Sequence, residues 1–172
     1  QIVAVELDPE AAAQAAENVA SSPWSERIEV VTAALQQLDT EPFDLIVSNP
    51  PYFVHGQIFS SAARQQARHT SSLSHEELLE HGLRLLAPNG RIALVLPIAA
   101  AERVMLLAEQ FGLGVELAQR LIPTPQKEPN RFLLLLSRCN GQLFGDDIVI
   151  CSGDGSYSDI YGDMVRDFYL KL

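Results

Sequence analysis

Short apolar runs alternate with amphipathic stretches along most of the chain. Runs of this length, rich in valine, isoleucine and leucine, predict β-strands. The predicted strands cover residues 2–5, 28–32, 43–48, 91–97, 115–121 and 132–137, and a further apolar stretch covers 147–151. The run at 43–48 is almost wholly apolar, which is typical of a strand buried on both faces of a sheet.

Four segments between these runs have the periodicity or the boundary signals of α-helices. They cover residues 8–20, 74–86, 99–111 and a terminal segment from about 158. Asp8 is a favourable N-cap, and Pro9 follows it at the first helical position. Ser74, with Glu77 three residues later, has the pattern of a capping box, and Pro88-Asn89-Gly90 is expected to stop that helix.

The alternation of strands and helices predicts an α/β fold with a mostly parallel, doubly wound sheet. The strands at 115–121 and 132–137 are expected to form an antiparallel hairpin with a long, proline-rich connection. We find no linker or internal repeat, so 1–172 is expected to be one domain with a substantial core. No membrane span or signal peptide is predicted. Cys139 and Cys151 have no metal-ligand spacing and are interpreted as reduced thiols.

The strand at 43–48 is followed by Asn49-Pro50-Pro51-Tyr52. An asparagine side-chain oxygen and the next carbonyl oxygen can both accept hydrogen bonds from one amino group. The prolines keep this loop extended and stiff, and Tyr52 offers a face on which a planar base or amide can stack. Asn-Pro and Pro-Pro are also ordinary loop signals. The whole tetrapeptide, however, resembles the catalytic motif of S-adenosylmethionine-dependent methyltransferases that modify exocyclic or amide nitrogens.

Glu6 follows the strand at 2–5 in the same way that Asn49 follows the strand at 43–48. Ligands of doubly wound sheets bind beyond the carboxyl ends of the strands, where an acidic side chain can bind both hydroxyls of a ribose. Taken alone, an acid after a strand is better explained as a solvated side chain. Paired with Asn49 on one sheet edge, Glu6 is interpreted as a cofactor ligand.

The net charge of −10 ordinarily argues against a nucleic-acid partner, but the charges are unevenly distributed. Residues 1–44 carry nine acidic groups and one arginine, whereas 45–75 carry no acidic group and include Arg64 and Arg68. A second basic stretch contains Arg120, Lys127, Arg131 and Arg138. If both stretches reach the rim that carries Asn49, an anionic substrate meets positive potential there.

Four segments carry a more specific resemblance, at residues 3–8, 22–28, 43–52 and 64–70. Together they resemble the bacterial tRNA adenine-N6 methyltransferases that act on valine tRNA, whose target is the adenine 3′ of the anticodon, at position 37. The resemblance runs from the first residue to the terminal helix. It implies a Rossmann-like class I methyltransferase fold, S-adenosyl-L-methionine as methyl donor and tRNA as partner. We further expect a monomeric, cytoplasmic enzyme without a metal ion and without membrane association.

The expected site residues fall into three groups. The catalytic loop consists of Asn49, Pro50, Pro51 and Tyr52. The expected contacts of the methyl donor are Glu6, Leu7, Ala34 and Asn49. The expected contacts of the RNA are Tyr52, Phe53, Arg64, Arg68, Lys127 and Arg131.

Two departures from the family's pattern matter. The family's first strand and glycine-rich cofactor loop have no counterpart in residues 1–172, so we expect a partial domain that lacks half of the donor pocket and is inactive alone. Ala34 stands where the family commonly has an acidic residue that contacts the donor's adenine, so any contact there must come from backbone groups. Release-factor glutamine methyltransferases, and methyltransferases of DNA or rRNA with the same motif, remain alternatives for the substrate.

Overall fold

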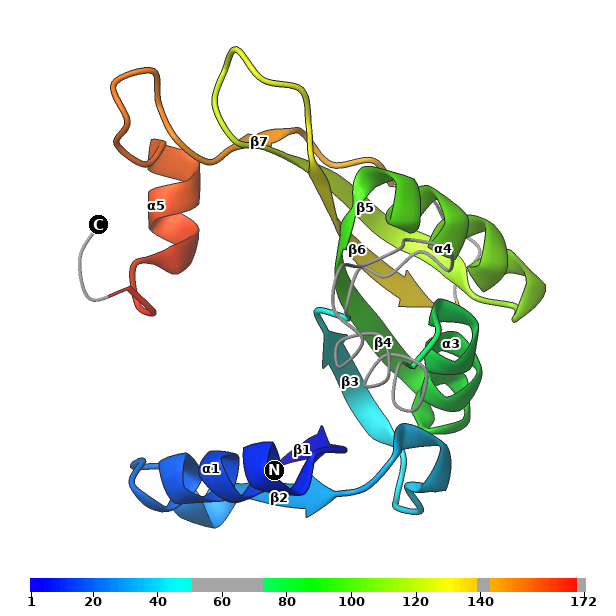
Figure 1. Ribbon diagram of the computed structural model, residues 1–172. Coiled ribbons are helices and arrows are strands. Elements are labelled where there is room, and N and C mark those ends of the chain that lie inside the picture. Colours follow the sequence, from blue (N-terminus) through cyan, green and yellow to red (C-terminus); the bar gives the residue numbers. More distant parts are fainter. Residues whose placement is uncertain (51–72, 139–142, 170–172) are drawn as a thin grey trace, which may run out of the picture. The chain divides into compact units, whose positions relative to one another are not determined.

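The computed structural model describes residues 1–50, 73–138 and 143–169, which belong to two compact units (Figure 1). Unit 1 comprises Gln1–Glu41 and Ile58–His81, and unit 2 comprises Pro42–Gln57 and Gly82–Leu172. The described strands form a two-stranded sheet in unit 1 and a five-stranded sheet in unit 2. The expectation that residues 1–172 are one partial domain stays a prediction.

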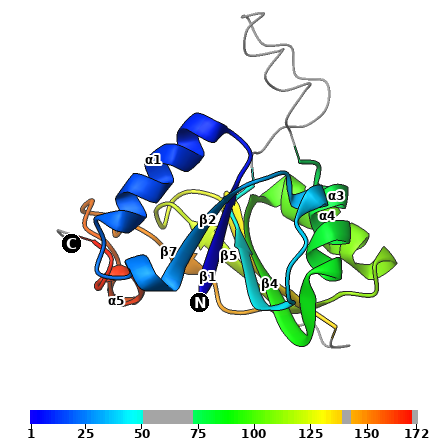
Figure 2. The ribbon, with the colours of Figure 1, turned by 90° about the horizontal axis from the view of Figure 1, so that it is seen from below.

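Unit 1 is built on two parallel strands, β1 (Ile2–Glu6) and β2 (Ile28–Thr32), which are paired along their whole length. The helix between them, α1 (Pro9–Ala20), packs on both strands (Figure 2). As the sequence predicts, Asp8 is the N-cap, and its side chain accepts hydrogen bonds from the backbone N–H groups of Glu10 and Ala11. Short 3-10 turns precede and follow β2, at Ser25–Arg27 and Leu35–Gln37.

The sheet of unit 2 has the strand order β3-β4-β6-β5-β7. These strands are β3 (Phe43–Ser48), β4 (Leu86–Pro97), β5 (Gly114–Ile122), β6 (Arg131–Ser137) and β7 (Ile148–Val149). Strand β6 is antiparallel to both β4 and β5, so the predicted hairpin of β5 and β6 is confirmed. The other ladders among the described strands are parallel, as predicted for a mostly parallel fold.

The described residues contain three further α-helices. They are α3 (His75–Arg84), α4 (Ile98–Gln110) and α5 (Asp159–Val165). Helix α4 packs on β4, β5 and β6, and α5 packs on β7 (Figure 1). The core of unit 2 combines alternate side chains of β4 and β6 with one face of α4, namely Ile92, Leu94, Leu96, Leu134, Leu136, Ala101, Val104 and Ala108.

The boundary between α3 and β4 differs from the prediction. The helix ends at Arg84, and β4 begins at Leu86, so the expected stop signal Pro88-Asn89-Gly90 lies inside the strand. Residues 87–90 form a bulge there, because Phe43 pairs with Leu86 and Leu45 already pairs with Arg91. The turn residues do interrupt regular structure, but they interrupt a strand rather than a helix.

The expectation that 43–48 is buried on both faces is wrong. Leu45 is 55% exposed and Val47 is 70% exposed, whereas Ile46 between them is half-buried. Among the described strands β3 pairs only with β4, so it is an edge strand of its sheet. Composition alone cannot reveal this, because an apolar run has the same letters at an edge as at the centre.

Candidate functional site

Glu6 is the last residue of β1, and its carboxylate is oriented by the chain that follows it. The backbone N–H of Asp8 donates a hydrogen bond of 2.9 Å to Oε1 of the half-buried Glu6. Asp8 is itself fixed as the cap of α1. Because one carboxylate oxygen receives this single bond, the group keeps acceptor capacity for the hydroxyls of a ribose. Leu7, the residue between them, is 44% exposed.

The end of β2 lies beside the end of β1. Glu6 pairs with Thr32, and the N–H of Ala33 donates to the carbonyl of Glu6 at 3.1 Å. Ala34 follows in an extended conformation and is half-buried. Neighbouring strands lie about 4.8 Å apart, so the ends of β1 and β2 are close to each other. In unit 1, Glu6 and the backbone of Ala33 and Ala34 therefore lie beside one another at the ends of two paired strands.

Asn49 and Pro50 follow β3 in unit 2, and they differ in burial. Asn49 is exposed, whereas Pro50 is buried. A buried proline after an exposed asparagine fixes the peptide between them, since φ of proline is locked and the preceding residue is held extended. That the side-chain oxygen of Asn49 and the carbonyl of Pro50 act together as acceptors stays a prediction from the sequence.

Arg131 begins β6 at the edge of the sheet at which β3 and β4 end. It pairs with Pro97, the last residue of β4, and with Leu121 of β5. Since β4 lies between β3 and β6, Arg131 is two strands from the end of β3, on the order of 10 Å at the usual spacing. Lys127 is exposed in the connection that leads to Arg131, where its N–H donates to the carbonyl of Thr124 at 2.9 Å.

The other two cations of this basic stretch are bound by other groups of unit 2. Arg120 forms a two-point ion pair with Asp147, from Nε to Oδ1 at 2.7 Å and from Nη2 to Oδ2 at 2.8 Å. The hydrogen bond and the charge of Asp147 raise the pKa of Arg120. Arg138 follows β6 at the opposite end of the sheet and donates to the carbonyls of Leu83, Leu86 and Ala87. Both arginines serve the structure of unit 2.

Five predicted site residues lie outside the described residues. They are Pro51, Tyr52, Phe53, Arg64 and Arg68. Their roles therefore remain predictions from the sequence.

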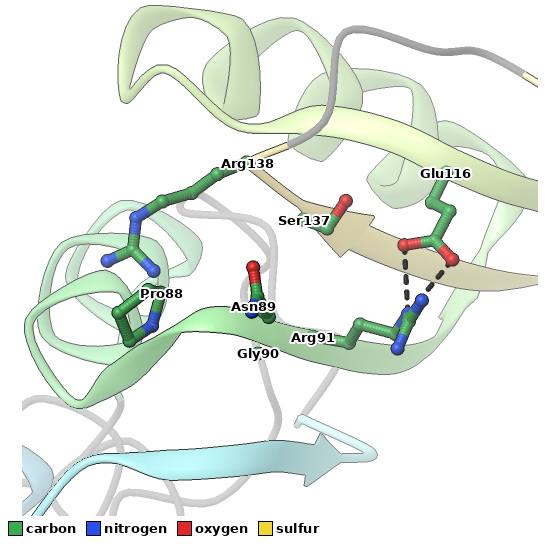
Figure 3. Close-up of a pocket in the computed structure, with 7 residues that line it drawn as sticks. All are labelled: Pro88, Asn89, Gly90, Arg91, Glu116, Ser137 and Arg138. Atoms are coloured by element: carbon green, nitrogen blue, oxygen red, sulfur yellow. Dashed lines mark hydrogen bonds and ion pairs between the residues drawn. The ribbon is translucent and has the colours of Figure 1, made fainter.

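A hollow of about 350 Å³ lies at the edge of unit 2 opposite to Asn49 (Figure 3). It is lined by Pro88, Asn89, Gly90, Arg91, Glu116, Ser137 and Arg138. Its charged groups are already paired, because Nε of Arg91 lies 2.9 Å from both carboxylate oxygens of Glu116 and Arg138 binds backbone carbonyls (Figure 3). None of the predicted site residues lines it, and ligands of such sheets bind at the carboxyl ends of parallel strands. We do not assign the site to this hollow.

One cluster near Ala34 is absent from the sequence-based prediction. The side-chain amide of Gln36 donates to Oε1 of Glu77 on α3, at 3.2 Å. The capping-box pattern of Ser74 and Glu77 is visible in the sequence, but the partner from the loop after β2 is 41 residues away and carries no local signal.

Across residues 1–50, 73–138 and 143–169, the structure has no group of acidic, histidine and cysteine side chains that could hold a metal ion. None of the helices in these ranges is long and apolar enough to cross a bilayer.

Comparisons with known proteins relate this chain to methyltransferases. A family model for the RMKL-like methyltransferase domain matches residues 1–101. The tRNA1(Val) (adenine(37)-N6)-methyltransferase of Aeromonas hydrophila is 48% identical over 172 residues, which are 100% of this chain and 73% of that protein.

Two solved structures share the fold. A predicted O-methyltransferase of Agrobacterium tumefaciens superposes with a TM-score of 0.68 at 16% identity, over 95% of this chain and 76% of the other. A TehB-like SAM-dependent methyltransferase of Corynebacterium glutamicum gives 0.51 at 18% identity, over 80% and 67%. These likenesses confirm the Rossmann-like class I methyltransferase fold that the sequence predicts.

Proposed function

Because the chain belongs to the tRNA1(Val) (adenine(37)-N6)-methyltransferase family, we propose that it transfers a methyl group from S-adenosyl-L-methionine to N6 of adenine 37 in valine tRNA. The observation that carries this proposal is the pair formed by exposed Asn49 and buried Pro50 at the end of β3. The enzyme is proposed to act as a monomer in the cytoplasm.

The side-chain oxygen of Asn49 and the carbonyl of Pro50 are proposed to accept the two hydrogens of the N6 amino group. The lone pair of this nitrogen is delocalised into the adenine ring, so the nitrogen is a weak nucleophile. Two acceptors favour a pyramidal nitrogen with its lone pair available. They would stabilise the positive charge that develops as the N–C bond forms and the bond between the donor's sulfur and its methyl breaks, with S-adenosylhomocysteine as the leaving group. The proton lost from N6 afterwards is acidic, so positioning rather than a strong base supplies much of the acceleration.

The methyl donor is proposed to lie at the ends of β1 and β2, with contacts from Glu6, Leu7 and Ala34. Asn49 is a further contact proposed from the sequence. Glu6 would accept hydrogen bonds from the ribose hydroxyls, and backbone groups beside Ala34 would contact the adenine. When bound, S-adenosylmethionine supplies an electrophilic methyl group that needs no further activation.

The RNA is proposed to be held by aromatic stacking and by cations. Tyr52 and Phe53 would stack on the target adenine, a contact worth roughly 1–3 kcal/mol per base in proteins that bind single strands. Arg64, Arg68, Lys127 and Arg131 would contact phosphates.

Asn49→Ala in the full-length protein should lower the rate of methyl transfer to valine tRNA by at least about a hundredfold, as expected for the loss of a hydrogen bond made in the transition state. The dissociation constant of S-adenosylhomocysteine, measured by calorimetry, should change little. Asn89→Ala, an exposed asparagine at the opposite edge of unit 2, is the matched control and should retain full activity. Near-normal turnover of Asn49→Ala would remove Asn49 from the mechanism.

Glu6→Gln should weaken binding of S-adenosylhomocysteine and leave tRNA affinity unchanged, because an amide cannot accept from both ribose hydroxyls as a carboxylate can. Glu29→Gln serves as control, since Glu29 is an exposed residue in the middle of β2. If the two variants bind S-adenosylhomocysteine with equal affinity, Glu6 does not bind the ribose and is only a solvated side chain.

The substrate class is tested with tRNA in which position 37 is guanine and with a glutamine-containing peptide. The proposal requires that valine tRNA is methylated and that neither the tRNA with guanine at position 37 nor the glutamine-containing peptide is methylated. Methylation of the peptide would instead support the glutamine alternative that shares the Asn-Pro-Pro-Tyr motif.

A further inference from the structure

In the loop after β2, residues 33–36, the first three residues have apolar side chains. At Ala34, N–H and C=O groups are therefore the means by which the loop can recognise an adenine edge. Backbone recognition depends on where the loop is held, because hydrogen bonds weaken steeply with misalignment. The start of the loop is fixed by the bond from Ala33 N–H to the carbonyl of Glu6, and its turn is closed by Gln37 N–H on the carbonyl of Ala34 at 2.9 Å.

The far side of the loop is held by Glu77. Its Oε1 accepts from the side-chain amide of Gln36, while its Oε2 accepts from Ser74 N–H at 2.8 Å and from Ser74 Oγ at 2.7 Å. Ser74 Oγ in turn accepts from the N–H of Glu77 at 3.1 Å, which completes the capping box of α3. One carboxylate therefore serves two purposes, the start of a helix and the position of a loop.

Glu77 is well placed for this role because its own helix is anchored. The next two residues, Leu78 and Leu79, are 3% and 0% exposed, so α3 is held by the core. The hydrogen bonds from Ser74 and Gln36 lower the pKa of Glu77, a group that is ionised at neutral pH. An ionised acceptor makes a stronger hydrogen bond to the Gln36 amide than a neutral acid would.

We propose that Glu77 is a positioning residue for the methyl donor, which through Gln36 holds the loop at residues 33–36 where the donor's adenine binds. This inference rests on the proposed function, since it takes the ends of β1 and β2 as the donor site. Glu77 does not touch the donor, and it acts through the loop.

The test compares two adjacent glutamines in the full-length protein. Gln36→Leu removes the amide that reaches Glu77 and leaves the capping box intact. Gln37→Leu is the matched control, because Gln37 is equally exposed and its backbone N–H remains in place. Gln36→Leu should raise the dissociation constant of S-adenosylhomocysteine about three- to tenfold, which is the range for one hydrogen bond. Gln37→Leu should leave it unchanged.

A second measurement distinguishes a change in the position of the loop at residues 33–36 from a general loss of stability. S-inosylhomocysteine carries a carbonyl where the adenine has its amino group, so the ratio of its dissociation constant to that of S-adenosylhomocysteine reports recognition of the base edge. Gln36→Leu should shrink this ratio and raise KM for the donor, with kcat unchanged at saturating donor. Ser74→Ala, which removes the helix cap but keeps the Gln36 to Glu77 bond, should lower thermal stability and leave the ratio unchanged.

The outcomes are distinct. If Gln36→Leu matches Gln37→Leu in both the dissociation constant and the ratio, the positioning role is overturned while the proposed function stands. If the wild-type protein binds no S-adenosylhomocysteine, the donor site and this inference fail together. A double variant, Gln36→Leu with Glu77→Gln, should be no weaker in donor binding than Gln36→Leu alone, because both changes break one link.

Discussion

Among single residues, Gly90 shows how a backbone contact can require glycine without any unusual dihedral angle. A Cβ atom at this position would lie 2.7 Å from the carbonyl oxygen of Phe43 and 2.8 Å from Cδ1 of Leu86. The sequence suggests a glycine that ends a helix. The structure shows a glycine that allows the bulge of β4 to approach the start of β3, the strand that Asn49 follows.

Gly90→Ala should therefore lower the free energy of unfolding by about 1–3 kcal/mol, the usual cost of overpacking. Gly162→Ala is the control, because Gly162 lies within α5 with no atom within 4 Å of the added methyl group. That change should raise the free energy of unfolding by roughly 0.5–1 kcal/mol through helix propensity. Urea denaturation measures both, and an equal effect of the two substitutions would contradict the contact at Phe43.

Among the elements, α3 has a complete capping box at its N-terminus. Its capping box satisfies the N–H groups of Ser74 and Glu77, and it places a carboxylate in the first turn, where the helix dipole favours negative charge. The same carboxylate is the group whose pKa is lowered, chiefly by the backbone and side-chain hydrogen bonds from Ser74.

This lowered pKa predicts a pH dependence. Since the folded protein lowers the pKa of Glu77, the stabilisation is fully present above the ordinary pKa of glutamate, about 4.3, and is lost as the pH falls through the lower folded value. Wild type should thus be more stable than Glu77→Gln at neutral pH, and the gap should narrow below about pH 4. Glu80→Gln, at an exposed residue of the same helix, is the control for the removal of one negative charge from α3. A gap that stays constant down to acid pH would exclude the carboxylate as its source.

For the molecule as a whole, charge and proposed partner are at odds. The net charge is −10, yet Lys127 and Arg131 lie at the edge of unit 2 on which β3 ends. Local positive potential can bind RNA on an acidic protein because screening confines each charge to about 8–10 Å at physiological salt. Arg120 contributes less to that potential, since Asp147 neutralises it.

Arg131→Ala should weaken binding of unmodified valine tRNA and reduce the slope of log affinity against log salt by roughly one unit, as for the loss of one phosphate contact. Arg64→Ala and Arg68→Ala are expected to do the same. Arg103→Ala removes an exposed arginine from α4 and serves as the charge-matched control. If plots of log affinity against log salt have equal slopes for Arg131→Ala and wild type, Arg131 does not contact the RNA.

The sequence by itself determined the features that depend on neighbouring residues. Asp8 with Pro9, and Ser74 with Glu77, mark helix starts because the cap and the N–H groups it satisfies are within three residues of each other. The same holds for Asn49-Pro50, whose stiffness is a property of the peptide, and for the hairpin of β5 and β6, which are consecutive strands.

Only the tertiary structure decided the features that depend on pairing between distant residues. The exposure of Leu45 and Val47 depends on which strands flank β3, and the role of Gly90 depends on the register of β3 against β4. The hydrogen bond from Gln36 to Glu77 joins residues 41 positions apart. Arg120 forms an ion pair with Asp147, which directly precedes β7 and is 27 positions away. Such contacts are fixed by long-range packing, which leaves no periodic trace in the local sequence.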